Sequence, residues 1–154
     1  MKKIGLLLQS NQEVGGIYQY CLTIVNAINT LDKKKYEFHI YYSEKFWKEK
    51  LPKNIKKTFI KENFFFKLVR KILFYFIRND ESWRLFRNFI YEDVKTLNRS
   101  SCDYIIMPSQ NRASYLVNKK TITSIHDLMH LYEKYSNDYD SETIEMRNKH
   151  YRMI

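Results

Sequence analysis

The chain has 154 residues, enough for one domain with a hydrophobic core and too few for two domains of ordinary size. Its hydrophobic fraction of 44% and aromatic fraction of 16% exclude an intrinsically disordered chain. The formal net charge of +10 at pH 7 predicts attraction to anions, which could be nucleic acid, an anionic membrane surface or a phosphorylated substrate.

The first residues resemble a signal peptide only superficially. The apolar run at residues 4–8 is too short for one, and polar residues stop it at once. Cys21 and Cys102 are isolated and lack a CxxC spacing, so we expect two reduced, structural thiols. These features predict a cytoplasmic protein.

The first 42 residues predict a strand, a helix and a second strand. Residues 3–9 form an apolar run typical of a buried strand, and residues 36–42 (YEFHIYY) form another. Between them, residues 16–31 predict a helix. Its apolar residues recur at helical spacing, namely Ile17, Cys21, Ile24, Val25 and Ile28. This is the size of a βαβ unit.

The rest of the chain continues the alternation. A weaker strand is expected at residues 58–60, and aromatic-rich helices at residues 64–78 and 81–97. Short apolar strands follow at residues 103–107 and 121–125, joined by a polar, helical connection.

The last segment, residues 141–154, has acidic residues early and basic residues late, the order that a helix dipole favours. Alternating helices and apolar strands predict an α/β fold, a Rossmann-like parallel sheet with helices on both faces.

Three segments follow predicted strands. Gly15-Gly16 follows the first strand, Ser109-Gln110 follows residues 103–107, and His126-Asp127 ends a strand that we expect to be buried. Ligands of parallel sheets bind outside the carboxyl ends of the strands, so we expect these segments to share one edge. Adjacent glycines there predict that a ligand approaches the backbone closely.

On these residues the chain resembles the N-terminal domain of GT-B-fold glycosyltransferases, in particular the retaining enzymes of family four. The matching segments are residues 15–18 (GGIY), 103–110 (DYIIMPSQ) and 123–131 (TSIHDLMHL), then Tyr135-Ser136 and a helix with Arg147. The resemblance covers nearly the whole chain.

The resemblance implies that residues 1–154 form the acceptor-side half of a two-domain enzyme. A C-terminal domain would bind the nucleotide sugar, and the family's Glu-x7-Glu segment and the basic residues that stabilise the leaving diphosphate would lie there. This domain is absent from the sequence, so we expect the chain alone to be inactive or nearly so.

The resemblance also assigns roles to particular residues. Gly15 and Gly16 would approach the donor phosphates, and His126 would lie near the donor sugar, with Asp127 positioning its loop. Tyr18 and Gln110 would contact the acceptor. Neither a metal nor another cofactor is expected.

The same residues could instead have purely structural roles. The glycine pair could form a tight turn, and His126-Asp127 could be a loop packed on the sheet. Residues 126–130 (HDLMH) imitate the zinc motif HExxH, which requires a helix and a Glu, whereas here a strand runs into His126 and Asp127 replaces the Glu. We therefore expect no zinc. His39 alternates with apolar neighbours and is expected to be structural.

The helix expected at residues 64–78 carries four cations on one side: Lys67, Arg70, Lys71 and Arg78. It is too short to span a bilayer, which takes about 20 residues, but it could lie on an anionic membrane surface. The alternative is a basic-edged helix that packs on the sheet. Nucleic-acid binding is disfavoured, because the cations are spread over the sequence and no recognition motif is present.

The sequence therefore predicts a domain of a glycosyltransferase that moves a sugar from a nucleotide sugar to a glycan or lipid-linked acceptor in surface polysaccharide synthesis. It would act in the cytoplasm or peripherally at the inner face of the membrane. The alternative is a non-catalytic binding domain, either a truncated remnant or half of a split enzyme completed by a partner chain.

Overall fold

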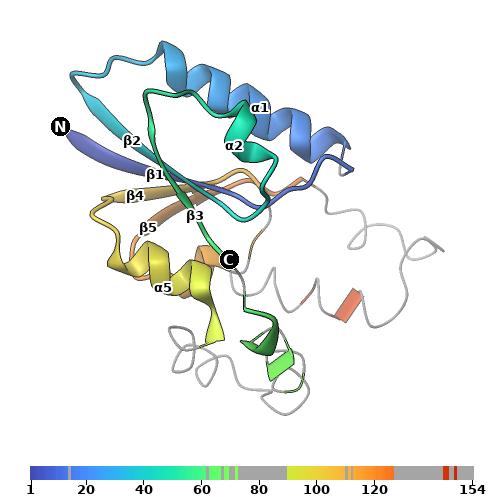
Figure 1. Cartoon of the computed structure of the whole chain (residues 1–154). Helices are drawn as coiled ribbons and strands as arrows, with labels where there is room; N and C mark the ends of the chain where they lie inside the picture. Colours follow the sequence, from blue (N-terminus) through green and yellow to red (C-terminus); the bar gives the residue numbers. More distant parts are fainter. Residues whose placement is uncertain are drawn as a thin grey trace.

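The computed structural model describes residues 1–13, 15–61, 63–66, 68–69, 72, 90–109, 111, 113–126, 144–145 and 148. Figure 1 shows its helices and strands. In chain order these are β1 (Lys2–Leu8), α1 (Gly15–Thr30), β2 (Tyr36–Tyr42), α2 (Trp47–Lys50), β3 (Lys56–Phe59), α5 (Glu92–Arg99), β4 (Tyr104–Met107), α6 (Ala113–Leu116) and β5 (Lys120–Thr123).

The strands form one sheet in the order β3-β2-β1-β4-β5, and every pair of neighbours is parallel. This confirms the predicted Rossmann-like α/β fold. The first strand lies at the centre, where Leu6 pairs with Ile40 of β2 and with Ile106 of β4. The strand order reverses between β1 and β4, which is the switch point where ligands bind in sheets of this kind.

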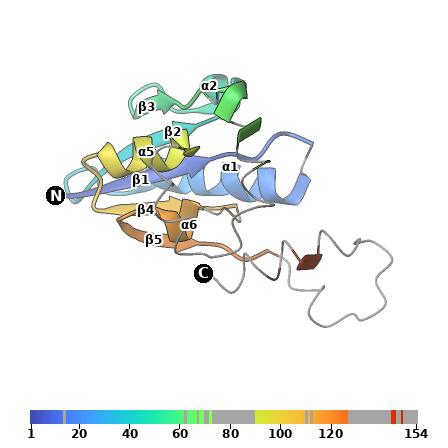
Figure 2. The same cartoon turned by 90° about the horizontal axis from the view of Figure 1, so that it is seen from below.

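Alternating strand residues supply two separate cores, one on each face of the sheet. Leu6 and Leu8 point to the face covered by α1 and α2, while Leu7 points to the face covered by α5 and α6. Helices α1 and α5 lie on opposite sides of the sheet in Figure 1, and α5 and α6 lie in front of the strands in Figure 2. Every central strand is thus buried on both faces, as a parallel sheet requires.

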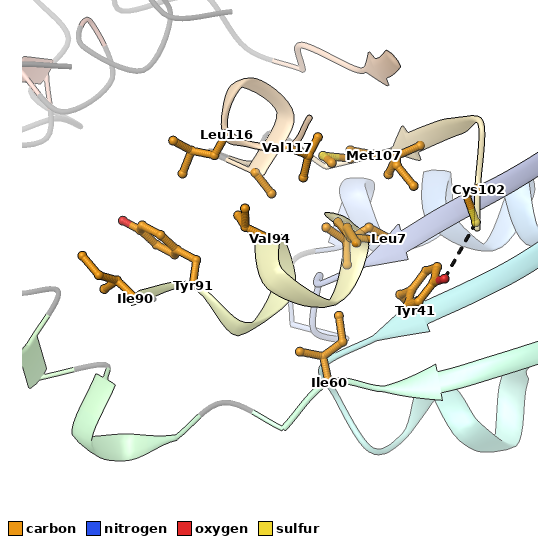
Figure 3. Close-up of a cluster of buried hydrophobic side chains, with 13 residues drawn as sticks. Leu7, Tyr41, Ile60, Ile90, Tyr91, Val94, Cys102, Met107, Leu116 and Val117 are labelled. Atoms are coloured by element: carbon orange, nitrogen blue, oxygen red, sulfur yellow. Dashed lines mark hydrogen bonds between the residues drawn. The ribbon is translucent and has the colours of Figure 1, made fainter. Parts of the chain in front are cut away.

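The helices bury the residues that their spacing predicts. In α1 the fully buried positions are Cys21, Val25 and Ile28, at offsets of four and seven. On the other face, Val94 of α5 and Leu116 of α6 pack with Met107 of β4 (Figure 3).

Two expectations about elements are wrong. The strand at residues 121–125 was expected to be buried, but β5 lies at the edge of the sheet and ends at Thr123, and Ile122 is 59% exposed. The helix at residues 81–97 does not run unbroken to its end, because the backbone is extended at Tyr91 and α5 begins at Glu92.

Several predictions fall outside the described residues. These concern Asp127, Gln110, Lys67, Arg70, Lys71 and Arg78, together with most of the helices expected at residues 64–78 and 141–154. In the part of the chain that is described, no helix is both long and apolar enough to cross a membrane.

Candidate functional site

The carboxyl ends of the strands bring three sequence-predicted segments to one edge of the sheet, called here the carboxyl edge. Helix α1 begins there after β1, Pro108 and Ser109 follow β4, and His126 lies three residues after β5. The expectation that these segments share an edge is confirmed by the parallel topology.

Gly15 and Gly16 are the first two residues of α1 and are exposed. Neither has a positive φ, and a Cβ built on either would meet nothing within 4 Å. The pair is therefore helical and not a tight turn, and packing within the described chain does not require glycine there. The absence of side chains leaves the backbone of the first helical turn bare.

A bare helix N-terminus attracts anions, because its first N–H groups have no partner in the helix and the dipole is positive there. The first turn of α1 contains no acidic residue. By contrast, α5 carries Glu92 and Asp93 in its first turn, and Asp93 accepts a hydrogen bond from Gln9 (2.9 Å). The first turn of α5 thus carries carboxylates, whereas the first turn of α1 carries none.

The His126 ring is held from two sides. Its Nε2 donates a hydrogen bond to the carbonyl oxygen of Pro108, and its ring meets the ring of Tyr20 edge-on, with centroids 5.1 Å apart and planes at 78°. The Tyr20 hydroxyl accepts a further hydrogen bond from Ser124 (3.1 Å). These contacts tie the segment after β5 to α1 and to the loop after β4.

The partner of Nε2 determines the tautomer of His126. A carbonyl oxygen only accepts, so Nε2 carries the proton, and in the neutral ring Nδ1 is left as an acceptor. The residue is exposed, and Nδ1 has the chemistry to accept a hydrogen bond from a ligand hydroxyl.

Tyr20 connects His126 with the glycine pair. It lies four residues after Gly16, and residues four apart share one face of a helix. His126 therefore packs beside the face of α1 that begins at Gly16. The site combines an anion-attracting backbone with an imidazole whose tautomer and orientation are fixed.

Tyr18 lies on the other side of α1, since two residues along a helix turn the side chain by about 200°. Its ring packs on Phe46 and Trp47, with centroids 5.8 Å and 5.4 Å apart. The structure does not bring Tyr18 and His126 together, and the role of Tyr18 in acceptor binding stays a prediction.

Sequence reasoning missed the residues that support the site. Tyr20 and Ser124 were not singled out, although the spacing of four from Gly16 to Tyr20 was visible. Ser10 was also missed: its carbonyl accepts a hydrogen bond from Trp47 Nε1 (3.0 Å) and its hydroxyl donates to Cys21 Sγ (3.4 Å). These bonds hold the start of the loop that leads into α1.

Within the described ranges, no group of three or more His, Cys, Asp or Glu side chains is placed to hold a metal ion. Comparisons with protein-family models, with curated proteins and with solved structures found no match to the chain.

Proposed function

We propose that this domain is the acceptor-side half of a retaining GT-B glycosyltransferase and that its carboxyl edge flanks a nucleotide-sugar donor. The observation that carries the proposal is the pairing of a side-chain-free helix N-terminus with an oriented histidine. It supports the proposal because a nucleotide sugar offers a diphosphate for the former and sugar hydroxyls for the latter.

In this proposal the first turn of α1 faces the donor diphosphate. Gly15 and Gly16 allow the phosphate oxygens to approach the backbone N–H groups, where a side chain would keep them away. The helix dipole stabilises negative charge, and this charge grows on the diphosphate as the bond to the sugar breaks. Further positive charge would come from the donor-binding half of the enzyme.

His126 orients the donor sugar. With Nε2 donating to Pro108, Nδ1 accepts a hydrogen bond from a sugar hydroxyl. The contact between the rings of His126 and Tyr20 limits rotation of the imidazole, so that less freedom is lost when the sugar binds. His126 and Asp127 are the proposed catalytic residues, and the acceptor is a glycan or a lipid-linked glycan at the inner face of the membrane. The proposed chemistry needs neither a metal nor a further cofactor.

Binding of nucleotide sugars to the chain tests this function. Saturation-transfer NMR with UDP-glucose and GDP-mannose should detect weak binding of at least one of them to the unaltered chain. The variant His126→Ala should bind about 2- to 10-fold more weakly, the effect of losing one hydrogen bond.

The matched control is His39→Gln, since His39 lies within β2 and both of its ring nitrogens already have partners in the chain. This variant should bind as the unaltered chain does. If His126→Ala binds either sugar nucleotide with full affinity, or if neither compound binds at all, the proposed function is wrong.

A further inference from the structure

The amino ends of the five strands form the edge of the sheet opposite the candidate site, and lysines gather there. In sequence they are separate short clusters, but each cluster precedes or begins a different strand of a parallel sheet. They therefore meet at the end where the N-terminus lies (Figure 1). We call this surface the lysine edge: Lys2, Lys3, Lys33, Lys34, Lys35, Lys53, Lys119 and Lys120.

Contacts join lysine clusters that are far apart in sequence. The backbone N–H of Lys2 donates to the carbonyl oxygen of Lys35 (3.0 Å). The ammonium groups of Lys2 and Lys120 lie 5.8 Å and 5.7 Å from the centre of the Tyr104 ring. Lysines at the starts of β1, β2 and β5 are thus close neighbours.

The positive charge of this edge is not cancelled by ion pairs. The carboxylates of Asp32 and Asp103 accept hydrogen bonds from backbone N–H groups of Lys34 and Lys3, both at 2.8 Å. Across the described residues, the one ion pair joins Lys95 to Glu92 (3.6 Å), on α5. The lysine ammonium groups therefore add their fields at this edge.

Two apolar side chains are exposed at the same edge. Met1 is 72% exposed immediately before β1, and Leu31 is 44% exposed between α1 and the cluster at residues 33–35. Lysines combined with exposed apolar side chains suit a membrane interface, where the ammonium groups meet phosphates and the apolar groups enter the headgroup region.

We propose that the lysine edge docks on the surface of an anionic phospholipid bilayer. Adjacent strands lie about 4.8 Å apart, so lysines at the starts of β2, β1 and β5 and before β3 spread over about 20 Å, which suits a flat charged surface. Lysine ammonium groups are point charges that bind headgroup phosphates without a fixed geometry. Nucleic acid is less well matched, since the rings of Tyr36 and Tyr104 are partly buried and offer no open stacking surface.

This proposal does not depend on the transferase function, because the lysine edge and the carboxyl edge lie at opposite ends of the strands. A bilayer bound at the lysine edge leaves Gly16 and His126 open to ligands.

Flotation of the chain with vesicles tests the proposal. Two variants of equal net charge are compared, so that a difference between them depends on where the lysines lie. The test variant is Lys33→Gln/Lys34→Gln/Lys35→Gln. The control is Lys45→Gln/Lys48→Gln/Lys50→Gln, which removes three equally exposed lysines beside or within α2, at the carboxyl end of β2. Both variants have the same net charge, and circular dichroism should show that both keep the fold.

With vesicles of phosphatidylglycerol and phosphatidylcholine at low salt, the unaltered chain and the control should float. The test variant should partition about 10- to 100-fold more weakly, as expected for three lysines at an anionic surface. Equal losses in both triple variants would overturn the proposal, as would failure of the unaltered chain to float.

Two further experiments test whether another surface of the chain binds the vesicles and whether the partner is nucleic acid instead. Replacing Lys67, Arg70, Lys71 and Arg78 by Gln should leave flotation largely intact, and loss of flotation in that variant alone would assign the contact to residues 64–78 instead. Binding of the chain to a duplex oligonucleotide at physiological salt, without vesicle binding, would also overturn the proposal.

Discussion

At the scale of single residues, two histidines show how surroundings separate a functional candidate from a structural one. His126 is exposed and has one ring nitrogen bonded to Pro108. His39 lies within β2, where Nε2 bonds to Thr58 Oγ1 (2.8 Å) and Nδ1 to the Tyr41 hydroxyl (3.0 Å). Its ring also stacks on the Tyr41 ring at 4.2 Å. Both ring nitrogens of His39 therefore form hydrogen bonds within the fold.

The His39 network depends on a neutral imidazole. Burial raises the pKa of the Tyr41 hydroxyl, and its hydrogen bond to Cys102 Sγ raises it further (Figure 3), so the hydroxyl stays protonated beside the His39 ring. Burial, and then the nearby charge of Lys56, lower the pKa of His39, while Glu37 opposes this. A doubly protonated ring can only donate, so neither ring nitrogen could then accept a hydrogen bond from Thr58 or Tyr41.

The pKa of His39 predicts a pH dependence of stability. Its value in the folded state lies below its ordinary value of 6.5, so the unfolded state binds protons more readily. The free energy of unfolding should be highest above about pH 6.5 and should fall as the pH drops from there toward the folded pKa. Urea unfolding at pH 7.5 and pH 5.5 measures this loss.

The variant His39→Gln removes the titrating group and should lose less stability between these two pH values than the unaltered chain. An unchanged pH dependence in His39→Gln would show that another group is responsible.

At the scale of secondary-structure elements, the glycine in β1 and the glycines in α1 lie in opposite surroundings, one closely packed and the others open. A Cβ on Gly5 would lie 2.6 Å from Ile105 Cδ1, so a larger residue in β1 would force the buried Ile105 side chain to shift. The first turn of α1 has open space at both of its glycines. Packing therefore explains the glycine in the strand but not those in the helix, for which we propose a ligand.

Alanine substitutions should separate these two reasons. Gly5→Ala should lower the free energy of unfolding by about 1–3 kcal/mol through overpacking. Gly16→Ala should leave it unchanged or raise it by up to about 1 kcal/mol, because alanine favours the helix. Urea unfolding of the two variants measures both effects.

The variant Ile105→Val tests the expected clash in Gly5→Ala, because it removes the Cδ1 atom that the new Cβ would meet. The double variant should be more stable than the sum of the two single effects predicts. Strict additivity, or a marked loss of stability in Gly16→Ala, would contradict this account of the glycines.

At the scale of the whole molecule, local patterns predicted most of the sheet. The apolar run at residues 36–42 coincides with β2, and the alternation of strands and helices predicted a parallel sheet. Parallel strands place their carboxyl ends together, so the shared edge of Gly16 and His126 also followed from sequence.

Features that depend on strand order were not predictable from local patterns. The run at residues 121–125 resembles a buried strand, and only its place at the edge of the sheet exposes Ile122. The lysines are spread along the sequence and are gathered by topology alone. The bond from His126 to Pro108 joins residues 18 apart and has no sequence signal.

The carboxyl edge is proposed to bind a nucleoside diphosphate between the first turn of α1 and His126. The decisive measurement is a titration of the ¹⁵N-labelled chain with UDP, in which the amide signal of every assigned residue is followed. Gly15, Gly16 and residues 124–126 should shift, while the buried Gly5 amide should not move. Shifts confined to residues 33–35 and the rest of the lysine edge would contradict this proposal, because UDP would then bind only as a general anion.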